Sequence, residues 1–282
     1  MTSPLLESDP ATAAAPAAAP LLSVDDLHLS AGARELVHGV SFDLAPGEAI
    51  GLVGESGSGK TLTCRAILGV PPPGVAVSGG TVRLAGDDVA HYTRRQWDRV
   101  RGPRIAAVFQ DPASYLNPSL TVGRQLTEVL RVKNGLHRRV ARARAVELLA
   151  SMGLHRPEHV HDQYPYELSG GMLQRVLIAI AVSGDPDLLV ADEATTALDV
   201  TVQAEVLDLI AALRAERRLS LLLVSHDLAV VAQLCDRVVV LRDGRVVESG
   251  PTRQVLDEPA DPYTRALVAD HREYGLDRLV AR

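Results

Sequence analysis

The residues best suited to chemistry in this chain form a glycine-rich loop that ends in a lysine and a threonine. The stretch Gly54-Glu-Ser-Gly-Ser-Gly-Lys-Thr61 fits the pattern G-x-x-x-x-G-K-[ST], whose backbone N–H groups curl around phosphates. The apolar run 49–53 predicts a buried strand before the loop, and residues 61–68 predict a helix after it. Because a helix N-terminus attracts anions, we expect Lys60 to reach the β- and γ-phosphates of a nucleotide and Thr61 to offer its hydroxyl to Mg²⁺.

A second group of chemically useful residues lies at the end of another predicted strand. The run Leu188-Leu-Val-Ala191 is apolar and is followed at once by Asp192 and Glu193. Downstream of a phosphate-binding loop, this pattern indicates that Asp192 holds Mg²⁺ and that Glu193 polarises an attacking water. The two groups together predict a site that hydrolyses a nucleotide.

Composition limits the class of protein. The chain has 282 residues, of which 46% are hydrophobic and only 3% aromatic, enough for one large domain with an aliphatic core. The net charge of −6 argues against nucleic acid as the main partner. Cys64 and Cys235 have no other cysteine at metal-ligand spacing, so we expect reduced thiols. Residues 1–20 are rich in Ala and Pro and lack Lys and Arg, which predicts a disordered tail rather than a secretory signal. No apolar run approaches the roughly 20 residues of a membrane span.

The rest of the chain alternates strand-like and helical patterns, which predicts an α/β domain with a mainly parallel sheet. Strand-like runs lie at 82–84, 105–109, 188–191, 219–225 and 237–241, and a helical pattern spans 203–217. The stretch from Leu120 to Ala181 lacks strand signals and predicts an inserted helical subdomain. Its basic run from Arg131 to Arg144 is most simply a solvated helix face, and contact with nucleic acid or lipid headgroups is the alternative.

The segment Leu168-Ser-Gly-Gly-Met-Leu-Gln-Arg175 resembles the signature of the ATP-binding-cassette (ABC) ATPases, which is close to Leu-Ser-Gly-Gly-Gln. In that family Ser169, Gly170 and Gly171 would serve the γ-phosphate of an ATP bound on the opposite subunit. The resemblance covers roughly residues 22 to 270. It implies an α/β, ABC-type P-loop nucleotide-binding domain with a RecA-like core and a β-subdomain. The domain would span 21–282, with an inserted α-helical subdomain at about 112–181.

Three more residues stand where this family has functional motifs. Gln110 is similar to the Q-loop glutamine that contacts Mg²⁺ and the attacking water, Ala197-Leu-Asp199 resembles the D-loop, and His226 resembles the switch histidine. The resemblance therefore implies Glu193, His226 and Gln110 as catalytic residues, and Thr61, Gln110 and Asp192 as Mg²⁺ ligands. The residues implied to bind ATP are Gly54, Glu55, Ser56, Gly57, Ser58, Gly59, Lys60, Thr61, Leu62, Ser169, Gly170, Gly171 and Asp199.

The chain departs from the family pattern at four positions. Ala31 stands where relatives usually carry an aromatic ring that stacks on adenine, and His28 is the only flat ring nearby. Loss of a stacking ring, worth on the order of 1 kcal/mol, predicts weaker ATP binding and less discrimination between ATP and GTP. Leu62 replaces a second threonine, Met172 replaces the signature glutamine and Ala194 replaces a proline, and none of these changes removes a catalytic group.

Several short segments resemble the oligopeptide, dipeptide and nickel branch of ABC importers. They are Phe109-Gln-Asp-Pro112, Leu116-Asn-Pro118, Tyr164-Pro-Tyr-Glu-Leu-Ser-Gly-Gly-Met172 and Asp261-Pro-Tyr-Thr-Arg-Ala-Leu267. Other segments are most similar to the first of the two nickel-import ATPases, namely Leu36-Val-His-Gly-Val40, Leu62-Thr-Cys64, Gly171-Met-Leu-Gln-Arg175 and His271-Arg-Glu-Tyr-Gly275. This resemblance favours nickel or a nickel chelate as cargo, with short peptides as the alternative.

The resemblance also implies partners and a location. The partners would be two transmembrane permease subunits, a second ATPase subunit from a different chain in a head-to-tail dimer, and indirectly an extracytoplasmic substrate-binding protein. The chain would lie at the cytoplasmic face of the cell membrane and use ATP with Mg²⁺. ABC ATPases of DNA repair or translation share the motifs, but the first carry coiled-coil insertions and the second two cassettes. A stand-alone P-loop kinase would lack the Ser169-Gly-Gly171 signature.

Overall fold

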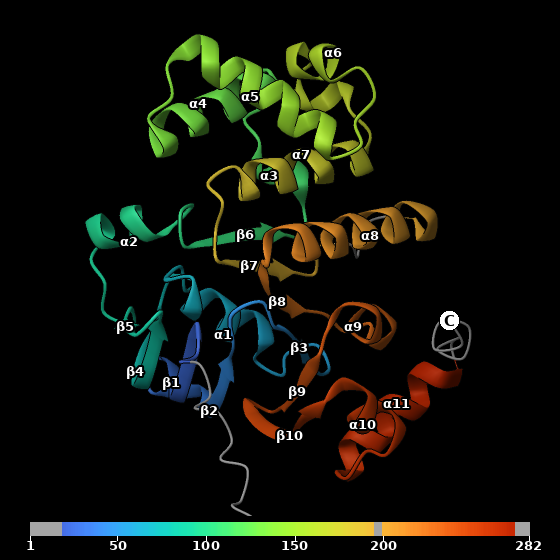
Figure 1. Cartoon of the computed structure of the whole chain (residues 1–282). Coiled ribbons are helices and arrows are strands. Elements are labelled where there is room, and N and C mark those ends of the chain that lie inside the picture. Colours follow the sequence, from blue (N-terminus) through green and yellow to red (C-terminus); the bar gives the residue numbers. More distant parts are fainter. Residues whose placement is uncertain (1–18, 195–198, 274–282) are drawn as a thin grey trace, which may run out of the picture.

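The computed structural model describes residues 19–194 and 199–273. The predicted disordered tail, residues 1–20, lies outside the described residues except for its last two positions. The D-loop residues Ala197 and Leu198 also lie outside them, as does the end of the segment His271–Gly275. In the described part, strands and helices alternate along the chain around two separate sheets (Figure 1).

A six-stranded sheet forms the centre of the molecule, in the order β10-β9-β3-β8-β7-β6. Five strands are parallel and β10 is antiparallel to β9, so the prediction of a mainly parallel sheet is confirmed here. Every residue of β3, β7 and β8 is buried, which explains their continuous apolar sequences. The strands are β3 (Ala49–Val53), β6 (Ile105–Phe109), β7 (Leu188–Asp192), β8 (Ser220–Val224), β9 (Arg237–Arg242) and β10 (Arg245–Pro251).

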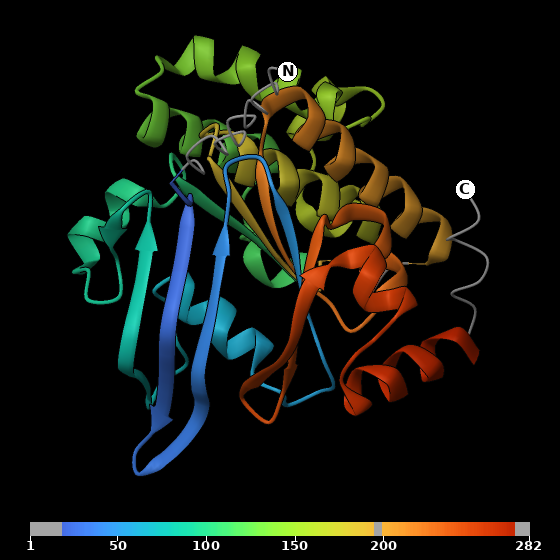
Figure 2. The ribbon, with the colours of Figure 1, turned by 60° about the horizontal axis from the view of Figure 1, so that its bottom comes forward.

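A second sheet is antiparallel, with four strands in the order β2-β1-β4-β5. Its members are β1 (Leu22–Ala31), β2 (Arg34–Leu44), β4 (Val75–Leu84) and β5 (Asp87–Asp88). The sequence pattern predicted only residues 82–84 as a strand here, because the exposed positions of β4 break the apolar run. Figure 2 shows β1, β2 and β4 as long strands beside the central sheet.

The central sheet separates two hydrophobic layers. Along β7, Leu188 and Val190 face a cluster shared with α1 (Lys60–Ile67) and the antiparallel sheet. Leu189 and Ala191 face the other cluster, which is built mainly from helices. The alternation places the sheet in the middle of a layered domain, as expected when both faces of a parallel sheet are covered.

The helix predicted at 203–217 is α8 (Val200–Arg217), and its apolar face, with Val206, Ile210 and Leu213, is packed on the core. It begins three residues earlier than predicted because the Asp199 carboxylate caps it, accepting the Val202 N–H at 3.0 Å. The remaining helices on this side are α9 (Leu228–Leu234), α10 (Thr252–Asp257) and α11 (Pro262–Glu273). Between β5 and β6 lies α2 (Arg94–Val100).

The stretch predicted to be helical lies at the top of Figure 1, away from the antiparallel sheet. It holds α3 (Pro112–Tyr115), α4 (Val122–Asn134), α5 (Arg138–Ser151), α6 (Pro157–Asp162), the short 3₁₀ turn η1 (Pro165–Glu167) and α7 (Gly170–Val182). The limits of about 112–181 for a helical subdomain stay a prediction. The basic run lies on α4 and α5 with its arginines exposed, an arrangement that fits a solvated face.

Candidate nucleotide-binding and hydrolysis site

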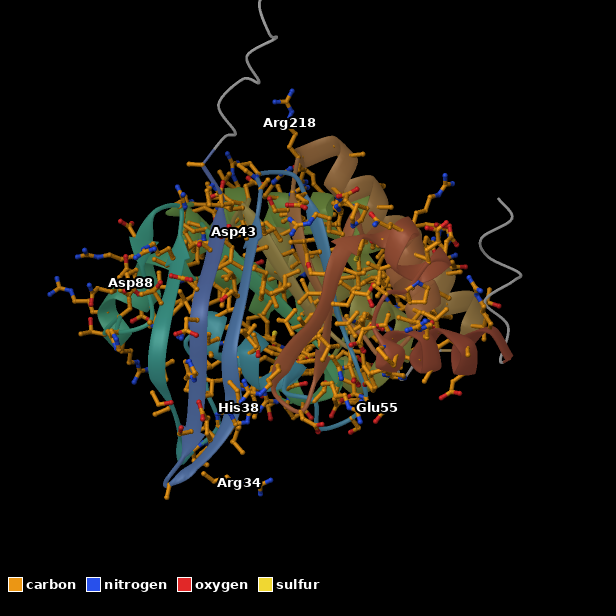
Figure 3. All side chains as sticks on the ribbon, turned by 90° about the horizontal axis from the view of Figure 1, so that it is seen from below. Arg34, His38, Asp43, Glu55, Asp88 and Arg218 are labelled. Atoms are coloured by element: carbon orange, nitrogen blue, oxygen red, sulfur yellow. The ribbon has the colours of Figure 1, made fainter. Side chains whose placement is uncertain are left out.

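The carboxyl ends of four parallel strands meet at one edge of the central sheet. The backbone register pairs Phe109 of β6 with Asp192 of β7, Asp192 with Val224 of β8, and Val224 with Leu52 of β3. The residues that follow these strands therefore start at nearly the same level. In Figure 3 the phosphate loop, marked by Glu55, lies at the end of the molecule opposite Arg218, which precedes β8.

The loop between β3 and α1 is held by its own lysine. Lys60 is only 5% exposed, and its ammonium donates to the carbonyl oxygens of Gly54 and Glu55, each at 2.7 Å. The Ser58 carbonyl accepts the Gly244 N–H at 3.0 Å, which fixes the loop to the β9–β10 turn. Burial lowers the pKa of the Lys60 ammonium, and the carboxylates of Glu193 and Asp192 oppose that shift. A buried cation in a glycine-rich turn at a helix N-terminus suits a polyphosphate.

Asp192 is the last residue of β7, and it lies beside the first turn of α1. Its carboxylate accepts the Thr61 hydroxyl at 3.4 Å, and the residue is 5% exposed. Burial raises the pKa of the Asp192 carboxyl, while the nearby Arg65 guanidinium acts in the opposite direction. One hydroxyl and one carboxylate match the small protein share of a Mg²⁺ shell, whose other ligands come from phosphates and water. In the described part of the chain no group of three or more His, Cys, Asp or Glu could hold a metal alone.

A cleft of about 390 Å³ brings most of the predicted catalytic residues together. Thr61, Gln110, Asp192 and Glu193 all line it, and they come from three different strand–loop junctions. Arg65 also lines the cleft and was missed by the sequence reasoning. Arg65 lies five residues after Lys60, and nothing in the surrounding sequence distinguishes it from an ordinary surface arginine.

Glu193 and His226 face each other at the mouth of this region. The His226 ring Nδ1 lies 3.4 Å from a Glu193 carboxylate oxygen, with their side chains 52% and 24% exposed. Glu193 has a positive φ of 50°, and its N–H donates to the Val224 carbonyl at 2.9 Å, so strand β8 fixes its backbone. Glu193 lines the cleft, where a water molecule can meet its carboxylate.

The signature residues are not part of this cleft. Ser169 caps α7 by accepting the Met172 N–H at 3.3 Å. Gly170 and Gly171 form the first turn of α7. None of these three, nor Asp199, is among the residues that line the cleft.

The positions that depart from the family pattern are accommodated without disturbing the site. Leu62 packs against the cluster that includes α1, and Met172 packs against the helical cluster. Ala194 is buried. Ala31 is the last residue of β1, and the His28 ring is bonded to the carboxylates of Glu35 at 2.5 Å and Asp26 at 3.1 Å. The bond to Glu35 is the main reason why the pKa of His28 is raised.

This geometry defines a P-loop nucleotide hydrolase, with the end of a phosphate loop and an acidic strand end lining one cleft. The ABC transporter family model matches residues 37–196. The chain therefore belongs to the ABC transporter family, and it is the ATP-hydrolysing subunit of an ABC importer.

Comparisons with known proteins place it near peptide-import ATPases. It is 46% identical to a putative peptide import ATP-binding protein of Brucella melitensis over 267 residues, covering 93% of this chain and 80% of the relative. It is 46% identical to the oligopeptide transport ATP-binding protein AppD of Bacillus subtilis, over 82% of this chain and 71% of the relative. It is 44% identical to the probable D,D-dipeptide transport ATP-binding protein DdpD of Escherichia coli, over 92% and 80%.

Two solved structures share the fold. The structure of cbiO1 from Clostridium perfringens, part of the cbiONQ transporter complex, matches with a TM-score of 0.75 at 26% identity, covering 92% of this chain and 96% of that one. A dimeric ATP-binding cassette bound to ADP and Pi matches with a TM-score of 0.72 at 25% identity, covering 82% and 99%. The predicted ABC-type α/β fold is confirmed by these matches.

Proposed function

We propose that this chain powers the import of short peptides. The similarity to proteins named for peptide, oligopeptide and dipeptide transport carries this proposal, at 44–46% identity over most of the chain. It reverses the preference reached from short segments, which favoured nickel. Because a match over 267 residues samples far more positions than four short motifs, we give it more weight.

In the proposed reaction, Lys60 and the loop of residues 54–62 hold the phosphates of ATP. Thr61, Asp192 and Gln110 hold Mg²⁺, which supplies charge neutralisation at the phosphates when bound. Glu193 accepts a proton from the attacking water, and His226, with its ring nitrogen 3.4 Å from the Glu193 carboxylate, orients that side chain.

A second ATPase subunit would complete the site. Ser169, Gly170, Gly171 and Asp199 lie outside the cleft that holds the other site residues, which supports their use by the ATP of a partner subunit. The dimeric form of the similar ADP-bound cassette supports the same arrangement.

None of the helices in the described ranges is both long and apolar enough to cross a bilayer. We propose that permease subunits contact an apolar groove of about 270 Å³ between β6 and the helical stretch. Val70, Phe109, Val129 and Ile180 are among its lining residues. Phe109 lines both this groove and the catalytic cleft, so a permease bound there would lie next to Gln110. The chain would thus lie at the cytoplasmic face of the membrane, fed by an extracytoplasmic binding protein.

The groove assignment is testable by one substitution. Val129→Asp places a charge in the groove and should abolish co-purification with the permease subunits while leaving ATP binding intact. Val132→Asp is the matched control, because Val132 is 72% exposed on the same helix and is not among the groove residues. Unchanged co-purification of the Val129 variant would exclude this groove as the permease contact.

Nickel import remains a second candidate because of one specific observation. Residues 36–40, 62–64 and 171–175 resemble a nickel-import ATPase. The absence of an adenine-stacking ring at Ala31 fits that subtype too. The two candidates differ only in cargo, which is chosen by partner subunits rather than by the residues of this cleft.

Uptake measurements separate the candidates. Cells that lack this chain would receive the wild type, Glu193→Gln, or the matched control Glu216→Gln, in which an exposed glutamate of α8 is changed. Uptake of a labelled dipeptide and of nickel would then be measured side by side. We expect dipeptide uptake with the wild type and the control, and none with Glu193→Gln. Restored nickel uptake without dipeptide uptake would replace peptides by nickel, and restoration of neither would reject both cargoes.

A further inference from the structure

The last described helix, α11, is fixed to the central sheet by its first residues. The Glu248 carboxylate of β10 accepts the backbone N–H groups of Ala260 and Asp261 at 2.9 and 3.0 Å. The Asp261 side chain in turn accepts the Tyr263 N–H at 2.8 Å. In Figure 1, α11 lies beside α10 at the edge of the domain. These bonds give the segment Asp261-Pro-Tyr263 a local structural role, because they set where the helix starts and which way Tyr263 points.

Tyr263 contacts the phosphate loop across 208 positions of sequence. Its hydroxyl oxygen accepts the Glu55 N–H at 2.9 Å, and its ring lies under the Arg242 guanidinium at 4.8 Å from the ring centre. The Glu55 N–H and the Gly54 carbonyl belong to the same planar peptide group, in which they point in opposite directions. That Gly54 carbonyl accepts the Lys60 ammonium at 2.7 Å. Tyr263 and Lys60 are therefore bonded to opposite sides of one rigid peptide.

His271 makes an equivalent contact with the loop after β8 that contains His226, called the switch loop below. Its ring Nε2 lies 2.7 Å from the His226 carbonyl oxygen, and its Nδ1 lies 2.9 Å from the Leu267 carbonyl oxygen in its own helix. A carbonyl oxygen only accepts, so the Nε2–H tautomer of His271 donates to the His226 carbonyl. The peptide that follows His226 is also held from its other side, because the Asp227 N–H donates to the Ser225 hydroxyl at 2.9 Å.

Both contacts come from one helix. Tyr263 and His271 are eight positions apart, about 12 Å of helix at 1.5 Å per residue. We propose that α11 holds the phosphate loop and the switch loop in a fixed relation, and that Tyr263 and His271 are positioning residues for ATP hydrolysis. Tyr263 acts through the peptide between residues 54 and 55 on Lys60. His271 acts through the His226 backbone on the contact between His226 and Glu193.

Helix α11 lies outside residues 37–196, the part of the chain that the ABC transporter family model matches. The inference concerns the ATPase activity, not the cargo, so it holds for a peptide or a nickel importer alike. A failed cargo assignment and a failed role for α11 are therefore distinguishable, because hydrolysis is measured without reference to the cargo.

The test for His271 compares two substitutions in the full chain assembled with its transporter subunits. His271→Leu removes the donor to the His226 carbonyl and should lower kcat about fivefold, with KM for ATP within about twofold. His271→Gln keeps an amide N–H at a similar reach and should retain at least about half of wild-type kcat. His155→Leu, at an exposed histidine outside the cleft, should change neither constant.

The test for Tyr263 removes one oxygen atom. Tyr263→Phe keeps the ring on Arg242 and should raise KM for ATP about threefold to tenfold, with kcat within about twofold, because only the bond to the loop peptide is lost. Tyr92→Phe is the control, since Tyr92 packs against Trp97 of α2, outside the cleft. Wild-type constants in both Tyr263→Phe and His271→Leu would overturn the proposal. So would an equal loss of kcat in His271→Gln and His271→Leu, because the donor would then not matter.

Discussion

Two glycines of the phosphate loop should respond very differently to the same substitution. Gly54 has a φ of +145°, and a Cβ added there would overlap the backbone carbonyl of Leu241 and come within 2.9 Å of the Ser58 hydroxyl. Gly57 has a φ of +84°, but a Cβ there would meet no heavy atom within 4 Å. Gly54→Ala and Gly57→Ala therefore share the backbone strain and differ in the space available.

The expected magnitudes follow from these two contributions. An alanine held at positive φ costs about 1–2 kcal/mol at either position. Overlap with the β9 backbone adds about 1–3 kcal/mol for Gly54→Ala, because Leu241 belongs to a strand that cannot shift alone. The loss of unfolded-chain freedom on changing Gly to Ala applies equally to both and cancels in the comparison. We expect Gly54→Ala to cost about 2–5 kcal/mol of unfolding free energy and Gly57→Ala about 1–2 kcal/mol.

Thermal unfolding of the nucleotide-free chain measures this difference. For a domain of this size, 1 kcal/mol corresponds to about 2–4 °C, so Gly54→Ala should lower Tm by about 10 °C and Gly57→Ala by about 3 °C. Circular dichroism at 20 °C establishes first that both variants fold. Equal losses at the two positions, or a larger loss for Gly57→Ala, would refute the argument from space around Gly54.

Three further outcomes are expected. Burial raises the pKa of the Asp192 carboxyl above its usual 3.8, so the ionised carboxylate destabilises the folded chain at pH 7. Asp192→Asn should therefore stabilise the Mg²⁺-free chain at pH 7 by about 1 kcal/mol, and thermal melts should show this gain vanish below pH 3.8. The same substitution should abolish ATP hydrolysis. Gly123→Ala would drive a Cβ into the buried His161 ring and should cost about 1–3 kcal/mol in urea unfolding. Burial raises the pKa of the Cys64 and Cys235 thiols, so both should resist iodoacetamide at pH 8 in the folded chain and react in urea, as mass spectrometry would show.

Much of the site was predictable because its parts are local in sequence. A strand, a glycine turn and a helix N-terminus follow one another between Ala49 and Ile67, so a short stretch fixes where Lys60 and Thr61 point. The same holds for Asp192 and Glu193 at the end of β7, and for Ser169 as the cap of α7. In each case the backbone geometry depends on neighbours within a few positions.

The antiparallel sheet was largely missed for the opposite reason. Strand β4 alternates exposed and half-buried residues through Val75–Gly80, and only its end is apolar enough to be recognised. Its place is set by pairing with β1, whose partner residues lie more than 40 positions away. A sequence pattern indicates whether one segment is buried, but it does not indicate which distant segment pairs with it or packs on it.

The sequence by itself determined the chemistry of this protein, because the phosphate loop, the acidic strand end and the signature each carry their geometry in a few adjacent residues. The tertiary structure alone decided how they meet. The order β3-β8-β7-β6 brings Thr61, Gln110 and Glu193 to one cleft, and α11 reaches the loop at Glu55 from residue 263. Such contacts arise because both faces of the central sheet must be buried by other segments. That requirement involves the whole described chain, so no local sequence pattern reveals it.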